Sequence, residues 1–295
     1  MSTRRTVIKN LVAGSVAIPA SKIFAGDMHL SEKNKPLKLK GNINHSVCRW
    51  ILGDLSLDEL CTAIKSVGFN AIDLLKPDEW PTVQKHGVYC SMCYTASDFS
   101  NNLYKGFAHA DQHAQLIKDY TEVIPLIAKA GYKDVICFTG TRNGMDDETG
   151  FKNCVDGLKQ VLPLAEKNGV TMHMELLNSK IDHKDYMCDH SAWGVELCKR
   201  IGSPNFKLLY DIYHMQIDEG DIVRTINDNH QYFGHYHTGG VPGRHEIDDT
   251  QELHYPAVMR AIVASGFKGY VAQEFMPTWK DKVASLKEAI QICDV

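Results

Sequence analysis

Asn168-Gly169-Val170-Thr171-Met172-His173-Met174-Glu175 joins an amphipathic segment to a short apolar run through a single glycine. A glycine at this place favours the left-handed cap that ends many helices. The apolar run that follows is typical of a buried parallel strand. The same junction recurs at Val67-Gly68-Phe69, His86-Gly87-Val88, Ala130-Gly131-Tyr132, Ile201-Gly202 and Ser265-Gly266-Phe267. The repetition predicts an α/β chain in which helices and strands alternate.

Short apolar runs that read as strands occur along the whole body of the chain. They cover residues 42–48, 71–75, 88–93, 134–138, 170–175, 206–210, 233–237 and 270–274. Helical patterns separate them, at 56–67, 77–86, 111–130, 151–168, 192–201, 221–229, 255–265 and 283–293. Strand–helix units of this number in 295 residues predict a single (β/α)8 TIM barrel over residues 41–295. A doubly wound sheet is the alternative, but the chain lacks its GxGxxG phosphate loop.

The composition is that of a globular enzyme, with 44% hydrophobic and 23% charged residues. A net charge of −4 argues against a nucleic-acid partner or an anionic membrane surface. No apolar run approaches the roughly 20 residues that span a bilayer. We therefore expect a small-molecule partner and no membrane span, and a homo-oligomer is left open.

The N-terminus has the three parts of an export signal. Arg4-Arg5 lies in a basic segment, residues 11–20 are mainly apolar, and small residues follow up to Ala25. The paired arginines predict a twin-arginine signal peptide at 1–25, then a polar leader at 26–40, and a periplasmic protein. The alternative is a frayed helix on a cytoplasmic protein.

The nine cysteines predict free, buried thiols, because their number is odd and they are scattered through apolar segments. Cys90 and Cys93 form a C-x-x-C motif, but no second pair follows at zinc-site spacing. We expect this motif to belong to a core strand.

Polar side chains end four consecutive predicted strands: Glu175, Asp211, His237 and Glu274. Each alone could be a helix N-cap or a strand-end ion pair. In a barrel, however, the carboxyl ends of the strands meet around one mouth. Three carboxylates and an imidazole gathered there would repel one another without a cation, and this donor set suits Mn²⁺ or Mg²⁺. The sequence therefore predicts one divalent cation at these residues.

Further residues near these strand ends are candidates for substrate contacts. His214 could orient the substrate or a ligand, and Arg244 could pair with a substrate carboxylate or form a surface salt bridge. Asn178 could bind substrate or cap a turn. His173 and His235 each lie two residues before a predicted ligand, so we expect inward-facing core histidines with their hydrogen bonds satisfied.

Residues 210–221, Tyr-Asp-Ile-Tyr-His-Met-Gln-Ile-Asp-Glu-Gly-Asp, resemble the hydroxypyruvate isomerase family of the xylose isomerase-like TIM barrel superfamily. Residues 203–208, 242–246, 252–255 and 269–274 also match, so the close resemblance covers about 175–279. The resemblance implies a divalent-metal site at Glu175, Asp211, His237 and Glu274, with both glutamates moving a proton. At His237 the chain departs from these isomerases, which carry Gln, and is similar to ketose 3-epimerases, which carry His.

The expected activity is metal-dependent isomerisation or epimerisation of a small hydroxy-carbonyl compound, such as a sugar or hydroxy-keto acid. Glu175 and Glu274 would transfer the proton through an enediolate that the cation stabilises. Two alternatives remain open: a metal-dependent hydrolase or endonuclease of the same superfamily, and a sugar-binding barrel without activity.

Overall fold

The computed structural model describes residues 37–295 except 54, 96 and 98. The predicted signal peptide at 1–25 and residues 26–36 of the polar leader lie outside the described residues.

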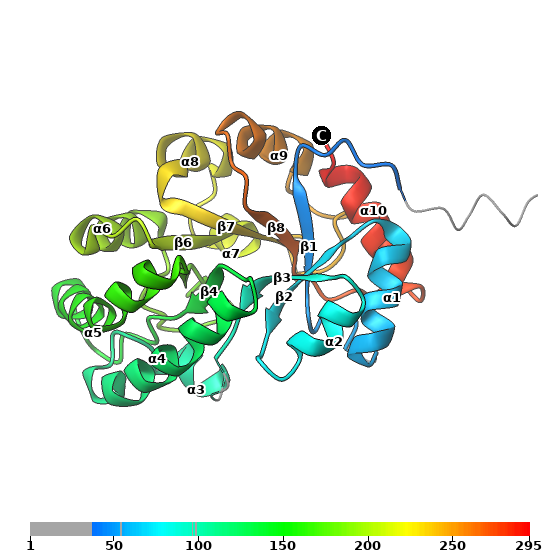
Figure 1. Cartoon of the computed structure of the whole chain (residues 1–295). Helices are drawn as coiled ribbons and strands as arrows, with labels where there is room; N and C mark the ends of the chain where they lie inside the picture. Colours follow the sequence, from blue (N-terminus) through cyan, green and yellow to red (C-terminus); the bar gives the residue numbers. More distant parts are fainter. Residues whose placement is uncertain (1–36, 54, 96, 98) are drawn as a thin grey trace, which may run out of the picture. The chain divides into compact units, whose positions relative to one another are not determined.

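Eight parallel strands close into a barrel in which every strand pairs with its neighbours in the sequence, and β8 pairs with β1. The strands are β1 Asn44–Cys48, β2 Ala71–Leu75, β3 Tyr89–Cys93, β4 Asp134–Cys137, β5 Thr171–Glu175, β6 Phe206–Asp211, β7 Phe233–Thr238 and β8 Tyr270–Gln273 (Figure 1). Each agrees with its predicted run to within two residues. The predicted TIM barrel is therefore confirmed.

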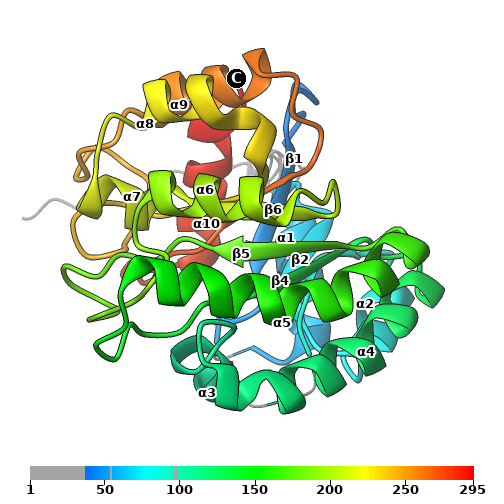
Figure 2. The same ribbon diagram turned by 90° about the vertical axis from the view of Figure 1, so that its left-hand side faces the viewer.

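Helices surround the strands, as Figure 2 shows for α4, α5 and α6 outside β4 and β5. The helices are α1 Leu57–Val67, α2 Trp80–Lys85, α3 Phe99–Tyr104, α4 His113–Lys129, α5 Asp147–Asn168, α6 Ser191–Ile201, α7 Ile212–Asp218, α8 Ile222–Asn229, α9 Tyr255–Ala264 and α10 Lys282–Cys293. Short 3-10 turns, Ala110–Gln112 and His230–Tyr232, precede α4 and β7. Helices α3 and α7 were not predicted.

The residues that cap the helices have the roles expected from the sequence. Ser56 and Glu59 form a capping box at the start of α1. Gly169 has φ +64° and ends α5 in the left-handed conformation, which costs glycine little because it has no Cβ. The junction that indicated the fold thus marks the turn from α5 into β5.

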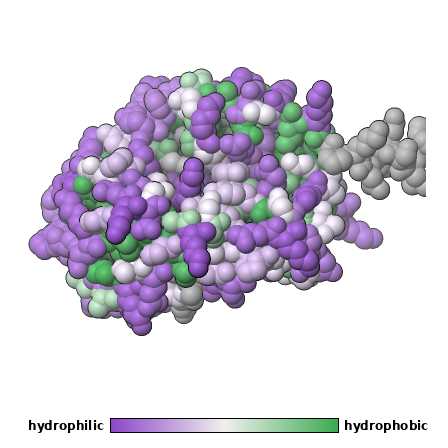
Figure 3. All heavy atoms as spheres, viewed as in Figure 1, coloured by the Kyte–Doolittle hydropathy of each residue, from purple (hydrophilic) through white to green (hydrophobic). Residues whose placement is uncertain are grey.

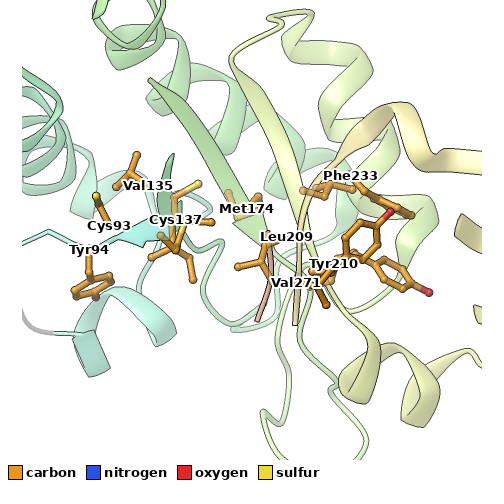
Figure 4. Close-up of a cluster of buried hydrophobic side chains, with 14 of the residues drawn as sticks. Cys93, Tyr94, Val135, Cys137, Met174, Leu209, Tyr210, Phe233 and Val271 are labelled. Carbon is orange, nitrogen blue, oxygen red and sulfur yellow. The ribbon is translucent and has the colours of Figure 1, made fainter. Parts of the chain in front are cut away.

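Apolar side chains from several strands pack together in the core. Figure 4 shows Val135, Met174, Leu209, Phe233 and Val271 among them, and each is at most 4% exposed. The face in Figure 3 is covered mainly by hydrophilic residues. Among the described residues, no helix combines the length and the apolar character needed to cross a membrane.

The cysteines are free and buried, as predicted. Cys90 and Cys93 lie within β3, with their sulfur atoms 3.5 Å apart. The C-x-x-C motif is therefore part of a core strand.

Candidate metal and active site

The structure brings together the four residues predicted as cation ligands. Glu175 and Asp211 end β5 and β6, His237 lies near the end of β7, and Glu274 follows β8. Each offers a ligand atom, and all four atoms lie within 4.8 Å of one another. All four side chains are buried.

This arrangement fits a hard divalent cation. Ligand atoms on opposite sides of such an ion lie about 4–5 Å apart, since each bond is roughly 2.0–2.6 Å long. Nδ1 of His237 lies 2.7 Å from Glu274 Oε2 and 3.2 Å from Glu175 Oε1. Neither contact has hydrogen-bond geometry, so this buried nitrogen is left without a partner. A cation between these atoms would satisfy all three side chains.

Burial and neighbouring charges shift the pKa values of the three carboxyl groups in this site. Burial raises the pKa of Glu175, and the nearby imidazole of His237 only partly opposes that rise. Burial also raises the pKa of Asp211, to about 8, although Arg244 opposes it. The pKa of Glu274 is shifted in the opposite direction. Burial raises it, but Arg244 and His237 together lower it to about 2. The two glutamates therefore differ in acidity despite their proximity.

Arg244 lies over the carboxylates and is not a surface salt bridge. Its Nη2 donates to Glu274 Oε2 at 2.6 Å and to Asp211 Oδ2 at 3.3 Å. The guanidinium stands 5.5 Å from the ring centre of Trp50 and 5.3 Å from that of Tyr213. These contacts hold a fixed positive charge at the candidate site.

Asp211 is both an N-cap and a member of the carboxylate group. Its Oδ1 accepts from the backbone N–H groups of Tyr213 and His214 at the start of α7. Its Oδ2 is left to face Arg244 and Nε2 of His214, which is 3.6 Å away. The cap fixes the carboxylate so that one oxygen faces the site.

His214 is completely buried and is oriented by Asn178, whose Nδ2 donates to Nδ1 of His214 at 2.6 Å. Burial lowers the pKa of His214 well below its usual value, so the ring is neutral. Its Nε2 has no hydrogen-bond partner and points at Asp211. A polar group of a substrate would satisfy this nitrogen.

Both polar atoms of the Asn178 side chain form hydrogen bonds within the protein. Its Oδ1 accepts from the backbone N–H groups of Ile181 and Asp182, which caps the turn after β5. Its Nδ2 donates to Asp182 Oδ2 as well as to His214. The residue therefore caps a turn, one of the two expected roles, and positions His214.

His173 and His235 are buried core histidines, as predicted, and each contacts an aspartate. The expectation that their hydrogen bonds are satisfied is wrong for His173, whose buried Nδ1 has no hydrogen-bond partner. His173 Nε2 lies 2.8 Å from Asp134 Oδ1, and His235 Nε2 lies 2.6 Å from Asp73 Oδ2.

Three residues near the site were missed by sequence reasoning. Asp73 in β2 is the one charged residue in an otherwise apolar strand, and that contrast was the available signal. Asp182 accepts from Tyr213 and Asn178. Trp50 donates its indole N–H to Glu274 Oε1 at 3.2 Å. The last two lie in loops, where no periodic pattern marks them.

The chain is similar in sequence to proteins with named activities. A 2-oxo-tetronate isomerase of Cupriavidus necator is 34% identical over 113 residues, which are 38% of this chain and 43% of that protein. A putative hydroxypyruvate isomerase of Homo sapiens is 31% identical over 104 residues, which are 35% and 38% of the two chains. The chain thus matches less than half the length of both relatives.

The structure of an AP endonuclease, family 2, from Brucella melitensis superposes with a TM-score of 0.75 at 20% identity. That match covers 83% of this chain and 97% of the other, and it shows a shared fold. Relatives with named activities include isomerases and epimerases of sugar-like compounds. The profile of the xylose isomerase-like TIM barrel family matches residues 61–293, so this chain belongs to that family.

Proposed function

We propose that the chain is a metal-dependent isomerase or epimerase of a small hydroxy-carbonyl compound, either a sugar or a hydroxy-keto acid. One observation carries the proposal: Glu175 and Glu274 approach the same unpartnered imidazole nitrogen of His237 from β5 and from the end of β8. The names of the relatives, which include 2-oxo-tetronate isomerase, support the same class of reaction.

The two glutamates are suited to opposite halves of a proton transfer. Glu274 is ionised at neutral pH, because Arg244 and His237 outweigh the effect of burial and hold its pKa near 2. It can therefore accept the proton of a C–H bond next to the substrate carbonyl. Glu175, whose pKa burial raises, can hold a proton and return it. Paired carboxyls with pKa values displaced in opposite directions are typical of such acid–base work.

Donation of the Glu175 proton to the neighbouring carbon, with transfer of the hydroxyl proton to the former carbonyl oxygen, completes an isomerisation, and donation to the opposite face of the same carbon completes an epimerisation. Glu274 then releases its proton to solvent and Glu175 takes one up, which restores both groups. When bound by Glu175, Asp211, His237 and Glu274, an Mn²⁺ or Mg²⁺ ion supplies a Lewis acid that polarises the substrate carbonyl. Arg244 and the free Nε2 of His214 offer donors for substrate oxygens at the same mouth.

The endonuclease alternative has less support. A net charge of −4 does not favour an approach to DNA phosphates, and the structural likeness to an AP endonuclease at 20% identity concerns the fold. Metal content separates the possibilities. One ion per chain supports the isomerase, about three support a multi-metal hydrolase, and none supports a barrel without activity.

The decisive experiment follows deuterium from solvent into candidate sugars and hydroxy-keto acids by NMR. Glu175→Gln and Glu274→Gln should each abolish exchange while the protein remains folded. Glu252→Gln is the matched control, because Glu252 is exposed and its carboxylate contacts Gln216, outside the four ligands. Exchange at the wild-type rate in either site variant would refute the assigned roles.

We also propose export to the periplasm through the twin-arginine signal at 1–25. A chain that folds before export would carry its buried thiols and its cation across together. Replacement of Arg4 and Arg5 by Lys should retain the protein in the cytoplasm, which cell fractionation measures.

A further inference from the structure

Asp73 is a fully buried carboxylate of β2 that contacts one of the four candidate ligands, His237. Its Oδ2 accepts from His235 Nε2 at 2.6 Å and from His237 Nε2 at 3.1 Å. Its Oδ1 accepts from the hydroxyl of Ser46 at 2.8 Å and from that of Ser91. Both oxygens are therefore held, and the plane of the carboxylate is fixed.

We infer that Asp73 is a positioning residue for the cation site: it accepts the Nε2–H of His237 and so turns Nδ1 toward Glu175 and Glu274. This inference rests on the proposed metal-dependent function. A ring that binds a cation is neutral and carries one proton, so a hydrogen bond that fixes this proton on Nε2 leaves the lone pair on Nδ1 for the cation. Nδ1 is the buried nitrogen that lacks a partner.

A histidine that binds a metal usually donates its other N–H to a carboxylate or carbonyl, which fixes the ring and makes the ligating nitrogen more basic. A carboxylate does this more strongly than a carbonyl because its charge assists the bond. The serine hydroxyls keep Asp73 from rotating away from His237, since they occupy its second oxygen. The candidate ligand His237 is thus oriented by an acceptor, Asp73, which His235, Ser46 and Ser91 hold in place.

The chain contains a matched control for a purely structural role. Asp134 Oδ1 contacts Nε2 of the buried His173 at 2.8 Å, so the barrel holds a second aspartate–histidine pair, in which the aspartate side chain is 26% exposed whereas that of Asp73 is fully buried. Neither Asp134 nor His173 belongs to the group of candidate ligands. Loss of Asp134 should disturb packing without affecting the cation.

The test titrates the metal-free full chain with Mn²⁺ by calorimetry. Asp73→Asn and Asp73→Ala should each weaken binding by about 10–100-fold, the usual range for such outer partners. Asp134→Asn and Asp134→Ala should leave the affinity within about twofold of wild type. Thermal unfolding of the metal-free proteins reports any loss of folding separately.

A second readout is spectroscopic. In ¹⁵N-histidine NMR of the Mg²⁺-loaded wild type, His237 should show a protected Nε2–H signal that Asp73→Ala removes. If Asp73→Ala does not fold, the Mn²⁺ affinity of Asp73→Asn and the Nε2–H signal of the wild type still test the inference. Wild-type affinity in a folded Asp73→Asn, or equal weakening by Asp134→Asn, would overturn the inference. Absence of Mn²⁺ binding by the wild type would instead overturn the proposed function.

Discussion

Arg244 donates from Nη2 to Glu274 Oε2 across 2.6 Å, and the same oxygen lies 2.7 Å from Nδ1 of His237. One carboxylate oxygen therefore faces both a guanidinium and an imidazole. A cation that binds the four ligands would share this oxygen with Arg244. The guanidinium thus opposes the cation electrostatically while it offers a donor to the substrate.

Arg244→Ala should lower kcat/KM by about 10²–10³-fold, the loss typical of a charged donor that acts on a developing oxyanion. Mn²⁺ affinity should stay the same or increase, because a positive charge beside the ligands is removed. Steady-state kinetics and calorimetry measure the two effects. Arg244→Lys should recover only part of the activity, since lysine lacks the planar group that stacks on Trp50 and Tyr213. Weaker Mn²⁺ binding in Arg244→Ala would contradict this account.

Asn178→Ala should cost about 1–3 kcal/mol in the free energy of unfolding, because the buried Nδ1 of His214 loses its donor and the backbone N–H groups of Ile181 and Asp182 lose their acceptor. Turnover should also fall, because His214 loses the donor that fixes its ring. Urea denaturation measures the first effect. The control is Asn229→Ala, which removes one hydrogen bond at a helix end and should cost less than about 1 kcal/mol. Equal decreases in the free energy of unfolding of the two variants would argue against the role of Asn178.

His45 should make the protein less stable in acid. Burial lowers the pKa of His45 to about 4, although nearby Asp294 opposes the shift. The unfolded chain protonates near pH 6.5, so His45 supports folding fully above that pH, and this support is lost as the pH falls from 6.5 to 4. The loss is at most about 3 kcal/mol.

The test compares the free energy of unfolding at pH 7 and pH 4. His45→Gln should reduce the difference between the two values, whereas His230→Gln, at an exposed position, should not. An unchanged difference in His45→Gln would show that the folded protein accommodates the charged ring.

The native protein should react very slowly with a thiol reagent, because its nine cysteines are free and buried. Burial also raises the pKa of Cys48 and Cys137, which suppresses the reactive thiolate. After denaturation without reductant, all nine should react at once. A count of seven would reveal a disulfide, for which Cys90 and Cys93 are the nearest candidates.

Sequence reasoning located the elements that local chemistry controls. Gly169 and Gly202 end helices where the pattern placed them, and β2 begins and ends at the predicted residues. Helix α7 was missed because it is a short element that begins at Ile212, directly after the strand-end residue Asp211, where the residues read as a loop beside the site. Its start depends on the side chain of Asp211, which serves as the N-cap.

The sequence by itself determined the barrel and the grouping of Glu175, Asp211, His237 and Glu274, because a closed parallel sheet brings all carboxyl strand ends to one mouth. Only the tertiary structure decided which atoms meet. In the folded chain Arg244 donates to Glu274, Asn178 donates to His214, and Asp73 accepts from His237. These contacts join residues from separate strands and loops, and their distances depend on the curvature of the barrel and the path of each loop. No local pattern in the chain encodes such distances.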